Sequence, residues 1–136
     1  MAQFDIHNDL LARVALNTAT IAASATTNGV IIDTQGFNAL EFFLQVGTRT
    51  DGSFTIQLQH GDDPALADAV AVDTAKVLGN AALTAITAAN SVRRIGYVGN
   101  KRYVRAQVVS TSVTSGATVG VLAVLGRPNL RPTAAN

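Results

Sequence analysis

The sequence has 136 residues, the usual size of one domain, and no cysteine, which excludes a disulfide framework and a cysteine-ligated zinc site. Charged residues make up only 14% of the chain, against about 25% in an ordinary globular domain, and the net charge is +1. Much of the surface must therefore be neutral, and neutral surface costs little to bury against a partner. This composition favours a protein with an extensive interface. The alternative is a β-protein with a Thr/Ser-rich exterior and no special interface.

Neither export nor membrane insertion is indicated. The start of the chain carries Asp5 and Asp9 but no basic stretch, so we expect no signal peptide. The apolar run at 117–126 is shorter than the ~20 residues of a spanning helix and is interrupted by Gly120. We predict one domain over residues 1–136 that makes no membrane contact.

Alternation of apolar and polar residues, the period of a β-strand, dominates the chain. Residues 13–23 alternate in part and are followed by an Asn-Gly turn at 28–29 and a short strand at 30–32. Residues 38–60 are predicted to form a hairpin, because two alternating runs flank an Asp-Gly turn at 50–53.

A second hairpin is predicted farther along the chain, with strands at 92–98 and 101–111 and a Gly-Asn turn between them. Residues 117–125 form a last strand whose second half is apolar on both faces. Such a strand is either covered on both sides within the domain or lies at an interface. Residues 63–78 are predicted to be a long connection, and long connections in compact domains tend to be functional or interfacial.

These elements predict an all-β fold, an antiparallel β-sandwich or jelly roll of about seven or eight strands. Residues 1–11 and 127–136 are expected to be extended arms at the two ends of the domain. The second arm contains Pro128 and Pro132, whose fixed backbone favours an extended chain.

The charges are distributed unevenly along the sequence. The chain up to Asp73 holds nine acidic and two basic residues, a net charge of −7, and the rest holds eight basic residues and no acid, a net charge of +8. In a β-sandwich the strands of both halves interleave, so the two sets could pair within the molecule. The other interpretation is a molecule with two oppositely charged faces, suited to ordered packing or to an acidic partner.

Basic residues of the second half are the candidate partner-binding residues. Around the turn of the second predicted hairpin they are accompanied by two tyrosines, which nucleic-acid binding by base stacking would require. The low net charge and the small number of aromatics favour contact with a protein over contact with nucleic acid, and a solvated face is the remaining alternative. The predicted set is Arg93, Arg94, Lys101, Arg102, Tyr103 and Arg105, with Arg127 and Arg131 in the second arm.

Few residues could carry chemistry. His60 precedes Asp62 and Asp63, but this short cluster lacks the ligand spacing of a calcium loop, so we expect a strand that ends in a polar turn and no metal. No serine lies in a G-x-S-x-G context, no phosphate-binding glycine motif occurs, and Glu41 is the single glutamate. We therefore expect a protein that is not an enzyme and needs no cofactor.

Four segments carry a family resemblance. They are Gln35–Leu40 (QGFNAL), Leu58–Asp63 (LQHGDD), Ile95–Arg105 (IGYVGNKRYVR) and Leu125–Pro128 (LGRP). In this order they resemble small proteins of the head-gene clusters of tailed phages, and among these the chain is most similar to the capsid cement, or decoration, proteins of short-tailed phages. The resemblance covers about 90 residues. Its motifs are structural, and no binding residue of the family matches a position in this chain.

The resemblance implies a virion protein, made in the host cytoplasm, that sits on the outer capsid surface as a homodimer or homotrimer. Its partners would be the major capsid protein and its own copies. Two other functions stay open from the sequence: a neck or tail component of the particle, and a carbohydrate-binding β-sandwich module. The absence of tryptophan and the presence of only two tyrosines disfavour the module, because such modules usually stack sugars on exposed aromatic rings.

Overall fold

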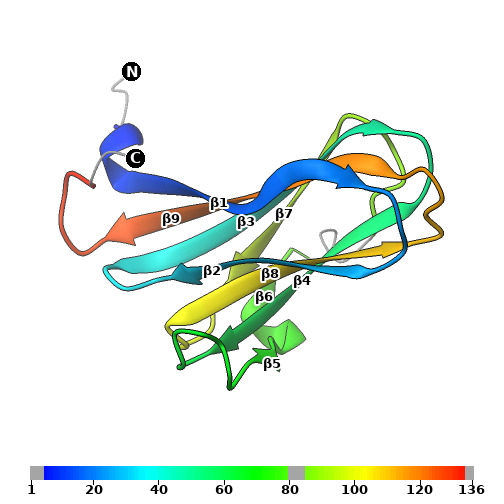
Figure 1. Ribbon diagram of the computed structural model, residues 1–136. Helices are drawn as coiled ribbons and strands as arrows, with labels where there is room; N and C mark the ends of the chain where they lie inside the picture. Colours follow the sequence, from blue (N-terminus) through cyan, green and yellow to red (C-terminus); the bar gives the residue numbers. More distant parts are fainter. Residues whose placement is uncertain (1–4, 80–84, 134–136) are drawn as a thin grey trace.

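The computed structural model describes residues 5–79 and 85–133, and these residues form two antiparallel sheets packed face to face (Figure 1). One sheet has five strands in the order β1-β9-β3-β7-β6, and the other has four in the order β2-β8-β4-β5. This architecture confirms the predicted all-β sandwich. The elements are η1 (His7–Asp9), β1 (Leu10–Ile21), β2 (Thr26–Asp33), β3 (Phe37–Arg49), β4 (Ser53–Gly61), β5 (Val70–Ala71), η2 (Thr74–Lys76), β6 (Val77–Leu78), β7 (Ser91–Tyr97), β8 (Tyr103–Thr111) and β9 (Ala117–Pro128).

The strand pairs are nested as in a jelly roll. β1 pairs with β9, β2 with β8, β3 with β7 and β4 with β5, as if one long hairpin had been folded and then rolled up. Rolling places successive long strands in opposite sheets, so the chain crosses between the sheets at most of its turns.

Both predicted hairpins are therefore wrong. β3 and β4 lie in different sheets, and so do β7 and β8. At the first of these turns the amides of Thr50 and Asp51 donate to the carbonyl of Gly116, a residue far away in the sequence, and this contact directs the chain across to the other sheet. Turn residues fix where a strand ends, but such non-local contacts decide which strand it pairs with.

The core lies between the sheets and follows the predicted alternation. In β3 the residues Leu40, Phe42, Leu44 and Val46 are buried, and so are their partners in β9. In β7 the partners of Leu40 and Phe42 are buried, whereas Arg93 opposite Leu44 is exposed. The facing side chains of the second sheet include Phe54, which is fully buried. No helix among the described residues is both long and apolar enough to cross a membrane.

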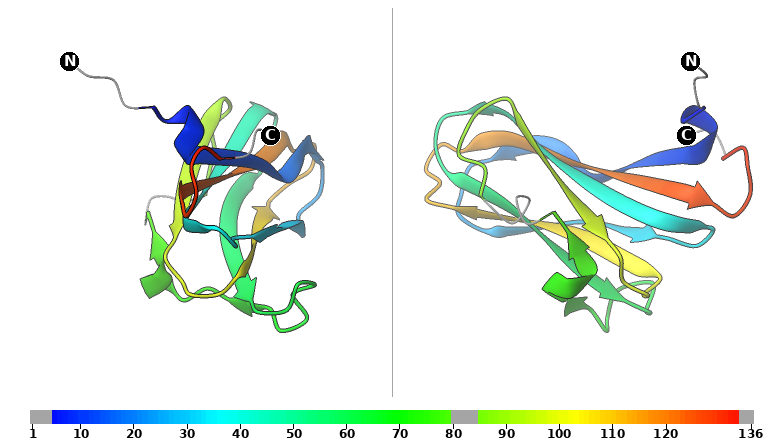
Figure 2. Two further views of the ribbon diagram at one scale, coloured as in Figure 1. Left: turned by 90° about the vertical axis from the view of Figure 1, so that its left-hand side faces the viewer. Right: turned by 180° about the vertical axis from the view of Figure 1, so that it is seen from behind.

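The two predicted arms are shorter than expected, and they are joined to each other. β1 already begins at Leu10, and β9 continues to Pro128. The amide of Thr133 donates to the carbonyl of Asn8, its hydroxyl donates to the carbonyl of Leu10, and Arg131 pairs with Asp9 at 2.9 Å. The two ends of the described chain are thus bonded to each other at one end of the sandwich (Figure 2), and we call this contact the terminal junction. Residues 1–4 and 134–136 lie outside the described part.

Candidate interaction surfaces

The predicted basic set does not form one cluster. Lys101, Arg102 and Tyr103 lie at the connection between β7 and β8, at the same end of the sandwich as Arg127 and Arg131. The other three members lie along the strands: Arg93 and Arg94 are in β7 of the five-stranded sheet, and Arg105 is in β8 of the four-stranded sheet. Because β7 and β8 do not pair, these residues do not gather around the turn of one hairpin.

Most of these cations have a partner within the chain. Each ion pair of the described residues joins an acid of the first half to a base of the second, which confirms the intramolecular interpretation of the uneven charge distribution. The pairs are Asp9–Arg131 at 2.9 Å, Asp33–Arg102 at 2.7 Å, Glu41–Arg94 at 4.0 Å and Asp62–Lys101.

The pair between Arg102 and Asp33 is bidentate. Arg102 donates from Nε to Oδ1 at 2.8 Å and from Nη2 to Oδ2 at 2.7 Å, and this hydrogen bonding lowers the pKa of Asp33 below its usual value. Nη2 of Arg102 also donates to Oε1 of Gln35, so three of the five N–H groups of this guanidinium are engaged within the chain. Arg93 and Arg127, by contrast, are exposed and have no ion pair within residues 5–79 and 85–133.

The two tyrosines are not free to stack on a ligand. Tyr97 is 8% exposed and lies inside the sandwich. The guanidinium of Arg102 lies 5.0 Å from the ring centre of Tyr103 and covers it. These positions leave neither a base-stacking nor a sugar-stacking platform of tyrosines.

His60 and Tyr97 form a buried polar contact between the sheets. The amide of Lys101 donates to the Tyr97 hydroxyl at 3.0 Å, and this hydroxyl is hydrogen-bonded to Nδ1 of His60 at 2.7 Å. The chain can close over the tyrosine because residue 99 is glycine: a Cβ there would lie 2.3 Å from the hydroxyl.

His60 was predicted to end a strand that leads into a polar turn, and the structure places it in β4, one residue before the strand ends. The inward orientation of its side chain was not predicted. The alternation of Phe54, Ile56 and Leu58 continues to His60, so parity alone directs its side chain inward. The neighbouring acids stay in the loop as expected: the Asp68 carboxylate accepts from the amides of Asp62 and Asp63, at 2.8 and 3.1 Å. Within the described ranges no group of three or more residues is arranged to hold a metal ion.

Burial makes the stability of the fold depend on pH through His60. Desolvation is the main cause that lowers the pKa of His60 from 6.5; Lys76 and Lys101 lower it further, and Asp62 and Asp68 oppose the shift. The unfolded chain then binds more protons than the folded one at mildly acidic pH. The free energy of unfolding is expected to decrease as the pH falls below about 6.5. Urea unfolding between pH 5 and 8 measures this; His60→Gln is expected to flatten the profile, and His7→Gln, at an exposed site, to leave it unchanged.

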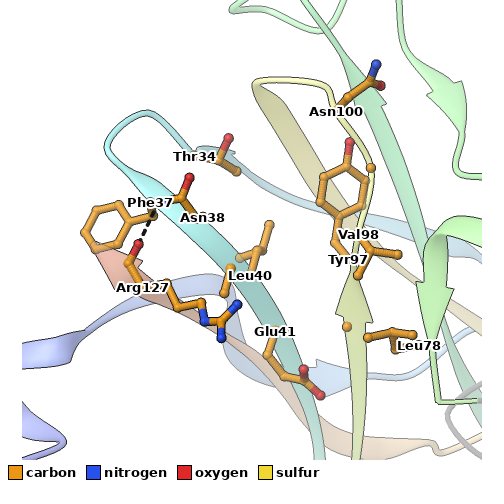
Figure 3. Close-up of a pocket in the computed structure, with 13 residues that line it drawn as sticks. Thr34, Phe37, Asn38, Leu40, Glu41, Leu78, Tyr97, Val98, Asn100 and Arg127 are labelled. Atoms are coloured by element: carbon orange, nitrogen blue, oxygen red, sulfur yellow. Dashed lines mark hydrogen bonds between the residues drawn. The ribbon is translucent and has the colours of Figure 1, made fainter. Parts of the chain in front are cut away.

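A groove opens where β3 and β7 diverge beyond the pair Leu40–Tyr97 (Figure 3). It has a volume of about 610 Å³, and its lining combines apolar side chains such as Leu78 with the polar side chains of Glu41 and Arg127. Its one carboxylate, Glu41, lies 4.0 Å from the guanidinium of Arg94, and the other titratable side chains of the lining are those of Tyr97 and Arg127. The groove therefore offers a contact surface of mixed apolar and polar character.

The outer faces of the two sheets differ in chemistry. The outer face of the five-stranded sheet is mainly apolar, with Val14, Leu78, Val92 and Leu122 each at least 42% exposed. The outer face of the four-stranded sheet is polar, and its side chains are occupied with each other. Gln107 donates to Asn28 at 2.6 Å, and Arg105 donates to Gln59 at 2.6 Å.

Comparison with known proteins gives one informative result. No family model matches the sequence, and no curated protein matches it significantly. The structure is similar to the crystal structure of the SPBc2 prophage-derived protein YomS, with a TM-score of 0.56 and 16% sequence identity over 88% of this chain and 94% of that chain. The likeness is one of fold. It shows that nearly the whole of both chains shares the arrangement of strands described above.

Proposed function

We propose that this chain is a structural protein of a phage particle, a capsid decoration protein that binds the outer surface of the head and clamps neighbouring major capsid subunits. The observation that carries the proposal is the apolar outer face of the five-stranded sheet, in a protein with only 19 charged residues, eight of which form ion pairs within the described part of the chain. The resemblance of its segments to phage cement proteins and the shared fold with a prophage-derived protein support the same conclusion.

Such a surface suits a capsid, which is assembled once and must then remain stable. A standard protein interface buries about 1,600 Å², and icosahedral repetition multiplies the effect of each junction through avidity. A surface with few free charges can be buried without leaving ions unpaired. The protein would be made in the host cytoplasm and act in the virion.

The end of the sandwich that holds the terminal junction is the candidate contact with the capsid. Leu130 is 84% exposed and Ile6 is 69% exposed, so both offer apolar area to a partner. Arg127, which lines the groove at the same end of the sandwich, is exposed and has no ion pair in the described part of the chain, so it can bind an acidic capsid residue without breaking an internal ion pair. Arg102 and Arg105 are weaker candidates for this role than the sequence predicted, because both are engaged within the chain.

We also propose that the protein works by binding and not by catalysis. The most unusual titratable pair, His60 and Tyr97, is buried, and the Tyr97 hydroxyl and Nδ1 of His60 are hydrogen-bonded to each other. A general base needs an accessible position within hydrogen-bond reach of a substrate. The covered tyrosines likewise count against a carbohydrate-binding module, which leaves a neck or tail component as the second candidate.

Counting copies in the particle tests the proposal. Quantitative mass spectrometry of purified virions that encode this chain is expected to give a fixed ratio to the major capsid protein, at hundreds of copies per particle. About six to twelve copies would instead assign the chain to a ring of cyclic symmetry in the neck or tail. Absence from the particle would contradict a virion role altogether.

The contact end has its own test within the same assay. Particles that lack the chain are mixed with purified protein, and bound copies are counted. Arg127→Glu is expected to reduce binding, because it introduces a carboxylate where an acidic partner is proposed. Arg93→Glu is the matched control. Arg93 is also exposed and has no ion pair among the described residues, but it lies in β7, away from the terminal junction.

A further inference from the structure

We infer that the outer face of the five-stranded sheet is a self-association surface, on which a second copy of this chain packs face to face about a two-fold axis. The inference goes beyond the proposed function, because it concerns the protein in solution and does not depend on any particle. It commits to one occupant, a second copy, for a surface that the isolated chain leaves uncovered.

The face is apolar across four neighbouring strands. Val14 of β1, Leu122 of β9 and Phe43 of β3 lie directly opposite one another in register and form one row across the sheet. Val124 continues the apolar surface in the next row. Phe43 and Val124 are half-buried, whereas Val14 is 53% exposed and Leu122 is 42% exposed.

The charges of the face indicate that the occupant is a second copy. Arg94 extends the row of Phe43, and Glu41 extends the row of Val124, so the face carries one cation and one anion. They are 4.0 Å apart, with 77% of the Arg94 side chain and 33% of the Glu41 side chain exposed, so each retains capacity for a further partner. In a two-fold dimer every contact occurs twice, and Arg94 of each copy can meet Glu41 of the other.

The position of Phe43 fits the same symmetry. β3 is the third of the five strands, and Phe43 is the seventh of the thirteen residues of β3. A face-to-face dimer that uses the whole sheet therefore brings the two Phe43 rings near its axis. Pairs of aromatic rings at such a position stabilise an interface beyond the area that they bury.

The area of the face is sufficient for a specific dimer. Four strands about 4.8 Å apart and about eight residues long, at about 3.4 Å per residue, cover roughly 500 Å². Two such faces give roughly 1,000 Å², which is the lower bound for a specific interface.

The other surfaces that could pair two sheets are less suitable. The outer face of the four-stranded sheet binds its own polar groups, as with Gln107 and Asn28. Pairing through strand edges is also disfavoured: β1 is interrupted by two irregularities of register, and β6 at the opposite edge has two residues.

Sedimentation equilibrium over a range of concentrations tests the inference. The unmodified protein is expected to associate to a dimer, and Leu122→Lys to weaken dimerisation roughly 100-fold, because a buried unpaired ammonium opposes association. Val30→Lys is the matched control, because Val30 is 55% exposed but lies in β2 of the other sheet. The Val30→Lys variant is expected to dimerise like the unmodified protein. Circular dichroism establishes that each variant is folded.

Charge exchange tests the two-fold arrangement. Glu41→Arg and Arg94→Glu alone are each expected to weaken the dimer, and the double variant to regain it. A monomeric unmodified protein, or a dimer that Leu122→Lys leaves intact, would overturn the inference. If Leu122→Lys and Val30→Lys weaken dimerisation equally, the assignment to this face is overturned. If the double variant Glu41→Arg with Arg94→Glu stays monomeric, the two-fold charge contact is overturned.

Discussion

Replacement of Gly29 by alanine is expected to lower the free energy of unfolding by at least ~3 kcal/mol, the largest effect of any single methyl addition that we consider. A Cβ at this position would lie 2.3 Å from the carbonyl oxygen of Ala15 and 2.8 Å from that of Ala106. Both oxygens belong to the backbone, in β1 and β8, so neither can move away as a flexible side chain would. Relief of the clash requires β2 to separate from its neighbours.

The effect is large because Gly29 lies where the sandwich is closed along one side. β2 loses its regular register with β8 between Asn28 and Ile31, and β1 loses its register with β9 between Val14 and Leu16. The two irregularities face each other across Gly29 and Ala15, and they bring the edge strands of the two sheets into contact.

Gly47→Ala is the matched control for this prediction. Gly47 also lies within a strand, but a Cβ there would meet nothing closer than 3.8 Å, an ordinary contact. Alanine loses less conformational entropy than glycine on folding, so this variant is expected to be neutral or slightly more stable. Urea unfolding compares the two. Equal midpoints for Gly29→Ala and the unmodified protein would show that β1 and β2 do not approach as closely as described.

Gly29 also shows what the sequence could and could not predict about the fold. The strands were predicted correctly wherever one face is buried, because alternation is a local signal and burial enforces it. The Asn-Gly pair at 28–29 was predicted to be a turn, yet it lies inside β2, where the glycine permits a close approach of two backbones. A glycine serves both purposes, and only the neighbouring strand distinguishes them.

The pairing of strands could not be predicted from the sequence for a related reason. Asp51 illustrates the difficulty: its carboxylate accepts from the amides of Thr114, Ser115 and Gly116, more than sixty positions away. These bonds lower the pKa of Asp51 and fix the crossing between the two sheets, whereas the dipeptide that contains it is locally typical of a hairpin.

The candidate surfaces were predicted in part. The apolar character of both faces of the last strand was correctly noted, and the structure buries one of these faces in the core and leaves Leu122 on the other exposed. The basic residues were predicted as a binding set, but their internal partners could not be foreseen, since pairs such as Asp33–Arg102 join strands distant in sequence. Their role in binding a partner remains a prediction, and Arg127 is now its best candidate.

Tyr97→Phe is expected to lower the free energy of unfolding by about 1–3 kcal/mol, although it removes a single oxygen atom. The phenylalanine ring keeps the edge-to-face contact with His60, whose ring centre is 5.6 Å away. The hydroxyl, however, satisfies two buried or half-buried groups at once, the amide of Lys101 and Nδ1 of His60. Without it both are left without their partner, at a place that closes the side of the sandwich between β4 and β7.

The lowered pKa of His60 is expected to persist in Tyr97→Phe, because burial, its main cause, is unchanged when the hydroxyl is lost. The loss of stability in mild acid is therefore expected to remain. Tyr103→Phe is the control, because that ring lies at the surface beneath Arg102, and its free energy of unfolding is expected to change by less than about 0.5 kcal/mol. If the two variants unfold at the same urea concentration, the buried hydroxyl does not join the sheets.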